Sequence, residues 1–298
     1  MAEKPIPRWV GIALLLVIAT TFGANHIAAR IAFEHGANVT TAVAFRSTGT
    51  ALFVLVLLLW NGISLRVERR TLGHSVLIGV LLAVQSYSLY SAVALIPVAL
   101  ALLAFNTYPM LLALLSWAAG GERPSARTLF AMPVALAGLA LALDVGGRSG
   151  DVAGRWGEIG AGVLWATGAS ASFAAVLFLT TRWLAKMDGR LRSFLAMGVI
   201  SVVILAAGAT VGEFRLAQDA TGWIALALLT AFYGTAITSM FVLLPRLGAV
   251  NNAMVLNFEP IAVLGLGWVV LDQKVAPLQV LGAFVVVGAI MVLGSGRK

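Results

Sequence analysis

A few polar side chains lie within long apolar stretches of this sequence. Asn25 and His26 stand in the first stretch, and Glu259 stands in the last but one. Polar groups in hydrocarbon are costly, so they usually face the interior of a helical bundle or an aqueous cavity. A carboxyl group such as that of Glu259 can bind a substrate ammonium group or carry a proton. We therefore expect these side chains to line a path for a polar solute.

Glu259 has a second interpretation. It falls about eleven residues into an apolar stretch, close to mid-membrane, where an ionised carboxylate is disfavoured unless it is paired or hydrated. A neutral, hydrogen-bonded carboxyl would instead close the helix defect at Pro260. The sequence leaves the functional and the structural interpretation open.

Aromatic side chains extend the predicted path. The ring of Trp165 lies well inside an apolar stretch, so it is expected to line the cavity and to stack on an aromatic substrate or a cation; the alternative is an indole that faces lipid or packs between helices. All four tyrosines are further candidates: Tyr87, Tyr90, Tyr108 and Tyr233.

Asn106 and Asn257 each precede a proline by three residues, Pro109 and Pro260 respectively. A proline inside a helix removes a backbone hydrogen bond, which a side chain or water can replace. These prolines therefore predict helix kinks. The asparagines either support the kinks or contact substrate, and the two roles are compatible.

The sequence offers no catalytic machinery. It has no H-E-x-x-H or G-x-S-x-G motif, no Walker loop and no cysteine, and its three histidines are not spaced to hold a metal. We expect no enzyme activity, metal or cofactor. Without a nucleotide site, solute movement would be uniport or coupling to an ion gradient, with protons as one candidate.

The elements that hold these residues follow from composition. Hydrophobic residues make up 60% of the 298 positions and charged residues 11%, whereas soluble proteins have roughly 25% charged residues. Apolar runs of 18 or more residues are long enough to cross a bilayer core of ~30 Å. The predicted fold is all-α and integral to the membrane, with ten helices near 9–30, 38–60, 72–96, 97–118, 126–143, 157–183, 191–211, 221–244, 248–271 and 277–294. Pro97 either begins the fourth helix or kinks a longer one.

The net charge of +8 belongs to short linkers between apolar segments, so we interpret it as a signal of orientation and not of nucleic-acid binding. If the N-terminus is cytoplasmic, the inside carries Lys4, Arg8, Arg66, Arg69, Arg70, Arg123, Arg127, Arg182, Lys186, Arg190, Arg192, Arg246, Arg297 and Lys298. The outside then carries Arg148, Arg155, Arg215 and Lys274, with Arg30 and Arg46 near helix ends. Both termini are therefore expected to be cytoplasmic.

The sequence also repeats itself. A shift of 151 residues superposes Phe22 on Phe173, Asn106 on Asn257, Pro109 on Pro260 and Trp117 on Trp268. A duplicated unit with five crossings enters the membrane in the opposite sense the second time, which gives inverted repeats. We expect repeats at 1–147 and 148–298, arranged around a central cavity.

Two motifs resemble a known family. The first is Leu256-Asn257-Phe258-Glu259-Pro260 followed by Leu278-Gln279-Val280-Leu281-Gly282, and the second is Asn106-Thr107-Tyr108-Pro109 followed by Gly121-Glu122-Arg123-Pro124. These motifs, with Phe22-Gly23-Ala24-Asn25 in the first stretch, resemble the EamA-type repeats of the drug/metabolite transporter superfamily. The segment Tyr233-Gly234-Thr235-Ala236 is similar to YddG-type aromatic amino acid exporters.

The resemblance implies a secondary transporter that exports aromatic and other neutral amino acids, with broad specificity, across the bacterial inner membrane by alternating access. Its partners would be a small-molecule substrate and the lipid bilayer. A multidrug exporter of organic cations is the alternative, since Glu259 and the aromatic residues would suit such substrates equally. A membrane-embedded enzyme and a channel are less favoured, because inverted repeats with matched prolines favour rocking of one bundle against another.

Overall fold

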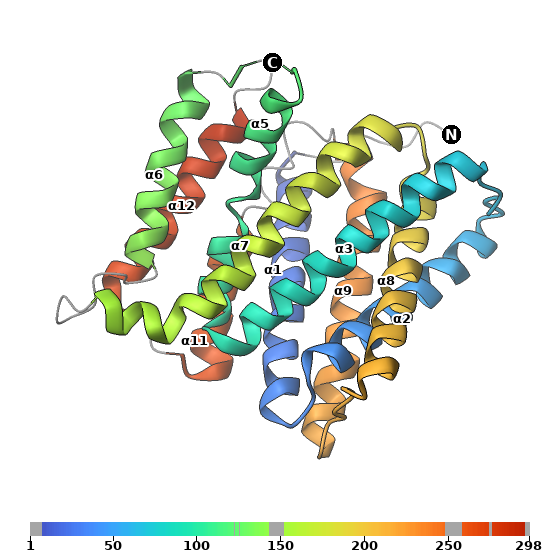
Figure 1. Cartoon of the computed structure of the whole chain (residues 1–298), viewed down its shortest axis with the longest axis horizontal. Helices are drawn as coiled ribbons and strands as arrows, with labels where there is room; N and C mark the ends of the chain where they lie inside the picture. The colour runs from blue at the N-terminus through green and yellow to red at the C-terminus, as the bar shows by residue number, and fades with distance from the viewer. Residues whose placement is uncertain are drawn as a thin grey trace.

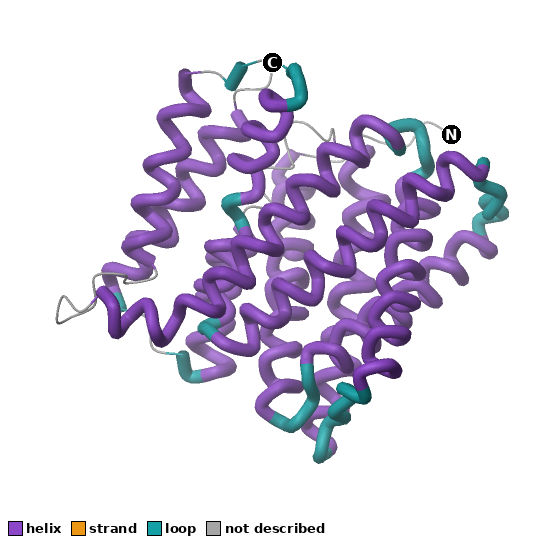
Figure 2. Tube along the Cα trace, in the orientation of Figure 1, coloured by secondary structure: helices purple, strands orange, loops and turns teal. Residues whose placement is uncertain are grey.

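The computed structural model describes residues 8–121, 123–124, 126–142, 152–247, 258–273 and 276–295. Within these residues the regular structure is entirely helical (Figure 2). The helices are α1 (Arg8–Glu34), α2 (Val39–Trp60), α3 (Arg69–Leu95), α4 (Val98–Phe105), α5 (Tyr108–Ala118), α6 (Ala126–Ala142), α7 (Val152–Trp183), α8 (Gly189–Val211), α9 (Ala220–Leu247), α11 (Glu259–Leu271) and α12 (Pro277–Ser295).

Length and composition make this a bundle that crosses a membrane. Seven spans, one of which comprises α4 and α5 together, are long and apolar enough to cross a bilayer, and three shorter apolar helices belong to α6, α11 and α12. Large apolar side chains such as Leu52, Val202 and Trp268 are exposed on the outside of the bundle, where lipid would cover them. The expectation of ten crossings in an all-α membrane fold is confirmed.

The crossing predicted at 97–118 is not one continuous helix. Pro97 caps the start of α4, so it separates α4 from α3. The chain then breaks at Asn106 and Thr107, and α5 begins with Tyr108 and Pro109 in its first turn. Proline suits this position, because the first amides of a helix have no partner within the helix. Figure 2 shows this break as a short loop inside the bundle, whereas the other loops lie toward its ends.

The pairing of helices follows the two halves of the sequence. The shift of 151 residues relates α1 to α7 and α3 to α9. Helix α1 packs on α9 and α3 packs on α7, so exchanging the two halves turns one pair into the other. Two further pairs, α2 with α8 and α6 with α12, join equivalent helices of the two halves, and α4 packs on α11, the counterpart of α5. Figure 1 shows the pair of α2 and α8 on one side of the bundle and the pair of α6 and α12 on the other. This symmetric pairing confirms the two inverted five-helix repeats.

Helices α6 and α12 approach each other very closely at two glycines. A Cβ atom added to Gly282 would lie 2.6 Å from the carbonyl oxygen of Gly138 and would also collide with the backbone nitrogen of Ala142. Small residues at such positions allow two membrane helices to pack backbone to backbone.

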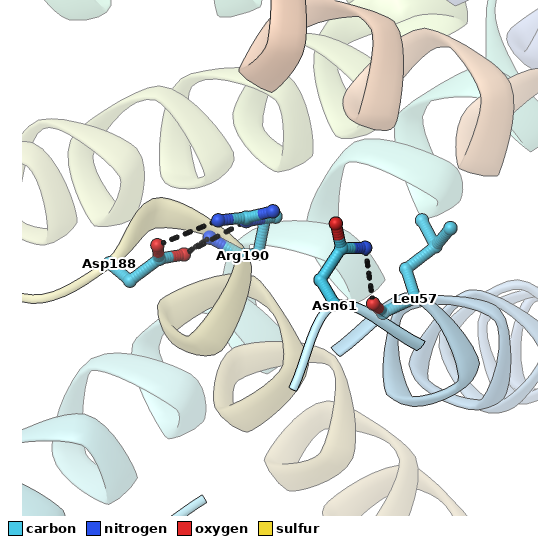
Figure 3. A network of polar contacts seen from close by, with 4 residues as sticks. All are labelled: Leu57, Asn61, Asp188 and Arg190. Carbon is cyan, nitrogen blue, oxygen red and sulfur yellow. Dashed lines mark hydrogen bonds and ion pairs between the residues drawn. The ribbon is translucent and has the colours of Figure 1, made fainter. Parts of the chain in front are cut away.

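Polar side chains cap two helices where α2 ends and α8 begins. The Asn61 amide donates to the carbonyl of Leu57, while Asp188 accepts the backbone N–H of Arg190 at 2.8 Å and pairs with its guanidinium at 3.2 Å (Figure 3). The hydrogen bond from Arg190 keeps the pKa of Asp188 below its ordinary value. These caps satisfy backbone groups that the helices leave free at their ends.

The opposite end of the bundle is tied by the loops α1–α2 and α8–α9. His35 Nδ1 lies 2.6 Å from a carboxylate oxygen of Asp219, and the Thr41 hydroxyl donates to the carbonyl of Arg215 at 2.8 Å. The backbone N–H of Gly222, followed by His35, holds the pKa of Asp219 below its usual range. The two loops belong to different repeats, so these contacts join the repeats at this end.

Candidate functional site

Two of the predicted polar residues meet in the middle of the bundle. His26 Nε2 lies 3.4 Å from Glu259 Oε1, with the imidazole buried and the carboxylate 24% exposed. Glu259 is the first residue of α11, so its carboxylate sits where the helix dipole favours negative charge. Pro260 follows in the same first turn. The first turn of α11 therefore holds an acidic group against α1 in the interior of the protein.

Tyr90 and Asn25 form the second contact of the site. The Tyr90 hydroxyl donates to Asn25 Oδ1 at 2.6 Å, and both residues are fully buried. The Asn25 amide donates in turn to the backbone carbonyl of Phe22. The Tyr90 ring lies against His26, with the ring centres 5.6 Å apart. Tyr90 belongs to α3. Its ring contacts His26 of the pair His26–Glu259, and its hydroxyl contacts Asn25.

Arg46 lies deeper in its helix than the sequence predicted. It was expected near a helix end, but it lies seven residues inside α2 with only 4% of its surface exposed. Its guanidinium donates to the Ser86 hydroxyl at 2.8 Å, and that hydroxyl donates to Gln85. The signal that could have identified it is a single arginine within a long apolar stretch. Assigning each Lys and Arg to the nearest helix end, in order to determine the orientation, concealed this residue.

Two tyrosines from different repeats enclose the guanidinium of Arg46. Its central carbon lies 4.9 Å from the ring centre of Tyr90 and 4.3 Å from that of Tyr233. The Tyr233 ring also makes an edge contact with Phe22 at 5.9 Å. Such positions over ring faces stabilise a cation. We call the residues joined by these contacts the central cluster: Asn25, His26, Arg46, Tyr90, Tyr233 and Glu259.

Hydrogen-bonding groups of the central cluster remain unused. Among the described side chains, buried atoms without a partner are His26 Nδ1, Arg46 Nε, Thr50 Oγ1 and Thr238 Oγ1. Most buried polar groups in proteins have a partner, so each exception needs an explanation. Two of the four belong to the central cluster, and Thr50 lies one helical turn from Arg46. These groups have the capacity to bind a solute.

A groove lies along α2. It has a volume of about 960 Å³, is mainly apolar, and lies between α2, α8 and α9. Thr50 and Gly234 line it, and they neighbour the central cluster on α2 and α9. Exposed rings such as Phe45 and Trp223 border it, with their centres 5.7 Å apart.

The remaining predicted residues make no hydrogen bond, ion pair or ring contact with the central cluster within the described part of the chain. Tyr108 lies within electrostatic range of Glu259, and its ring packs against Phe173 at 4.8 Å. Trp165 is 41% exposed and its ring meets Tyr87 at 6.1 Å. Their proposed place on a solute path stays a prediction.

The structure describes one of the two asparagines that were expected to support helix kinks. Asn106 is buried, and its amide donates to the carbonyl of Leu102 at 2.7 Å, which closes the end of α4. Asn257 lies outside the described residues, as does the boundary expected between positions 147 and 148. The contact of Asn106 supports the helix break and shows no link to the central cluster.

Comparisons with known proteins agree with this architecture. Residues 9–143 and 160–295 each match the model of the EamA-like transporter family. A solved crystal structure shares the fold with a TM-score of 0.62 and 17% sequence identity, and the match covers 95% of this chain and 95% of that chain. No curated protein matches the sequence. Because the two family matches together span most of the chain, this protein belongs to the EamA-like transporter family.

Proposed function

We propose that this transporter exports amino acids, both aromatic and other neutral ones, across the bacterial inner membrane. The observation that carries the proposal is the central cluster, in which a buried cation and a carboxylate lie among aromatic rings. A neutral amino acid carries one ammonium and one carboxylate group, and its side chain needs an apolar or aromatic surface. The cluster offers groups of matching chemistry to all three parts.

The proposed mechanism is alternating access. The central cluster takes residues from α1, α2, α3, α9 and α11, and therefore from both repeats. Movement of one repeat against the other would change which end of the bundle reaches it. We assign the repeats to residues 1–147 and 148–298, with a substrate cavity between them.

The orientation rests on the basic residues. The described loops and helix ends at the end of the bundle that holds the α2–α3 and α7–α8 connections carry Arg66, Arg69, Arg70, Arg182, Lys186, Arg190 and Arg192. Cytoplasmic loops are enriched in such residues. We therefore place this end, with both termini, in the cytoplasm, and the contact of His35 with Asp219 on the outer side.

A multidrug exporter of organic cations is the second candidate. The tyrosine rings and Glu259 favour it, because a cation binds to ring faces and to a carboxylate. Arg46 disfavours it, since a fixed positive charge in the central cluster repels a cationic substrate.

Efflux from cells tests the proposal. Bacteria that produce the protein are loaded with phenylalanine and threonine, and the amino acids released into the medium are measured over time. The proposal predicts faster release of both than from cells with an empty vector. If both amino acids are released no faster than from cells with the empty vector, and the cells also gain resistance to quaternary ammonium compounds, the organic-cation candidate would replace the proposal.

A further inference from the structure

We propose that Arg46 binds the carboxylate of the substrate and thereby restricts transport to solutes that carry an anionic group. The inference rests on the proposed function and deepens it, because it names the group of the substrate and the residue that selects it.

The charge of Arg46 is buried without a carboxylate partner in the described part of the chain. The described ion pairs are those of His26, Arg30, His35 and Arg190, and no described carboxylate pairs with Arg46. A guanidinium stays charged in proteins, so it cannot avoid the cost of burial by losing its proton. Such a charge is retained where it has a task other than stability.

The donors of Arg46 are only partly used. A guanidinium has five N–H donors in a planar fork that fits a carboxylate in a bidentate manner. The structure gives this one a hydrogen bond to Ser86 at 2.8 Å and a further side-chain hydrogen bond to the Tyr90 hydroxyl, and it leaves Nε without a partner. The rings of Tyr90 and Tyr233 cover the guanidinium. A carboxylate would use the free donors and balance the charge.

The fold itself does not require an arginine at this position. The shift of 151 residues that relates the repeats places Arg46 opposite Met197, which is buried at the equivalent place in α8. Helices α2 and α8 pack on each other as equivalent partners, so one apolar and one charged residue occupy matching positions. The helix packing at this position therefore accepts an apolar residue such as Met197, and the charge of Arg46 serves another purpose.

The depth of Arg46 suits a substrate site. It follows the start of α2 by seven residues, or about 10 Å along the helix axis, and His26 precedes the end of α1 by eight residues, or about 12 Å. Because α1 and α2 are joined at that end, the guanidinium and the imidazole lie at a similar level. The pair of His26 and Glu259 is then available for the substrate ammonium, while Arg46 takes the carboxylate.

Thermal unfolding of the purified protein in detergent, with and without three ligands, tests the assignment. The ligands are phenylalanine, phenylacetate, which lacks the ammonium group, and phenethylamine, which lacks the carboxylate. Three variants are compared with the unaltered chain: Arg46→Met, which copies the equivalent residue of the other repeat, Arg46→Lys, and Arg215→Met as a control in a loop.

The expected result separates binding from structure. Phenylalanine and phenylacetate should raise the unfolding temperature, and phenethylamine should do so far less. Arg46→Met should weaken phenylalanine binding by roughly 100-fold while its unfolding temperature without ligand stays equal or rises, because it removes an unpaired buried charge. Arg46→Lys should retain part of the affinity, since it keeps the charge without the fork, and Arg215→Met should behave like the unaltered chain.

Each opposite result has a distinct meaning. Equal protection by phenylalanine and phenethylamine would overturn the role of Arg46 and leave amino-acid transport standing. Protection by phenylacetate alone would support Arg46 as an anion site and overturn the amino-acid proposal. A loss of stability in Arg46→Met with unchanged phenylalanine affinity would make Arg46 structural, and absence of protection by any of the three ligands would overturn both proposals.

Discussion

The imidazole of His26 contacts the carboxylate of Glu259 across the boundary between the two repeats, at 3.4 Å between Nε2 and Oε1. The contact exists because α1 packs beside α11, whose first residue is Glu259. Under the proposed alternating access this boundary would move, so a titratable pair there is a natural place to couple protonation to transport.

Replacing Glu259 by Gln should reduce phenylalanine transport by at least about tenfold and abolish its dependence on pH between about pH 5.5 and 8. The amide keeps the size of the side chain but cannot ionise or pair with a protonated His26. The measurement is the flux of labelled phenylalanine into liposomes at a series of pH values.

The matched control is Glu34→Gln, because Glu34 pairs with Arg30 near the end of α1, away from the central cluster. Its pH profile should match that of the unaltered protein. An unchanged flux and pH profile in Glu259→Gln would reject a role in coupling and leave Glu259 as a structural residue of the first turn of α11.

Removing the hydroxyl of Tyr90 should lower the stability of the bundle. Tyr90→Phe leaves the buried oxygen of Asn25 without its donor, which typically costs about 1–3 kcal/mol. Tyr108→Phe should have little effect, because the Tyr108 hydroxyl makes no hydrogen bond with any described residue. Denaturant unfolding in mixed micelles measures both variants, and equal losses of stability would contradict the importance of the contact between Tyr90 and Asn25.

The close packing of α6 on α12 predicts an asymmetry between glycines. Gly282→Ala should destabilise the protein by about 1–3 kcal/mol, because the added methyl group meets the backbone of Gly138 and Ala142. Gly168→Ala should be neutral or stabilising, since nothing lies within 4 Å of its added Cβ. The unfolding temperatures of the two variants check this difference, and a neutral Gly282→Ala would show that the two helices pack less closely.

The contact of His35 with Asp219 predicts a pH-dependent stability. The pKa of Asp219 is lower in the folded protein than in the unfolded chain, first through the N–H of Gly222 and then through His35. Its stabilising effect is therefore complete above the ordinary carboxyl pKa of about 3.9 and is lost as the pH falls through the lowered value. The unfolding temperature of Asp219→Ala should thus be lower than that of the unaltered protein at pH 7, and the two should converge below about pH 4.

Glu213→Gln is the control for this measurement, since the Glu213 side chain makes no hydrogen bond or ion pair with a described residue. It should follow the unaltered protein at every pH. A constant difference between Asp219→Ala and the unaltered protein at all pH values would show that the carboxylate charge does not carry the effect.

The sequence predicted the helices and their symmetry well, because both depend on properties that can be counted along the chain. Apolar length defines a crossing, and the shift that matches Pro109 with Pro260 relates the repeats. The break before Pro109 was expected as a kink, and the structure separates α4 from α5 there. Whether a proline bends or interrupts a helix depends on neighbouring contacts, which the sequence does not contain.

The site was only partly predictable. Asn25, His26, Tyr90, Tyr233 and Glu259 were found because they are polar or aromatic within apolar stretches, and the structure brings them together. Arg46 was missed because Lys and Arg were assigned to the nearest helix end. Its burial depends on Tyr90 and Tyr233, which come from other helices and different repeats. A contact of this kind appears only when the helices are packed.

Counterflow into liposomes that contain only this protein tests the central claim most directly. Vesicles are loaded with unlabelled solute, and uptake of labelled phenylalanine, threonine or a quaternary ammonium compound is followed without an imposed gradient of protons. The account predicts transient accumulation of both amino acids, inhibition of each by the other, and no accumulation of the quaternary cation. Accumulation of the cation without either amino acid, or of none of the three, would contradict it.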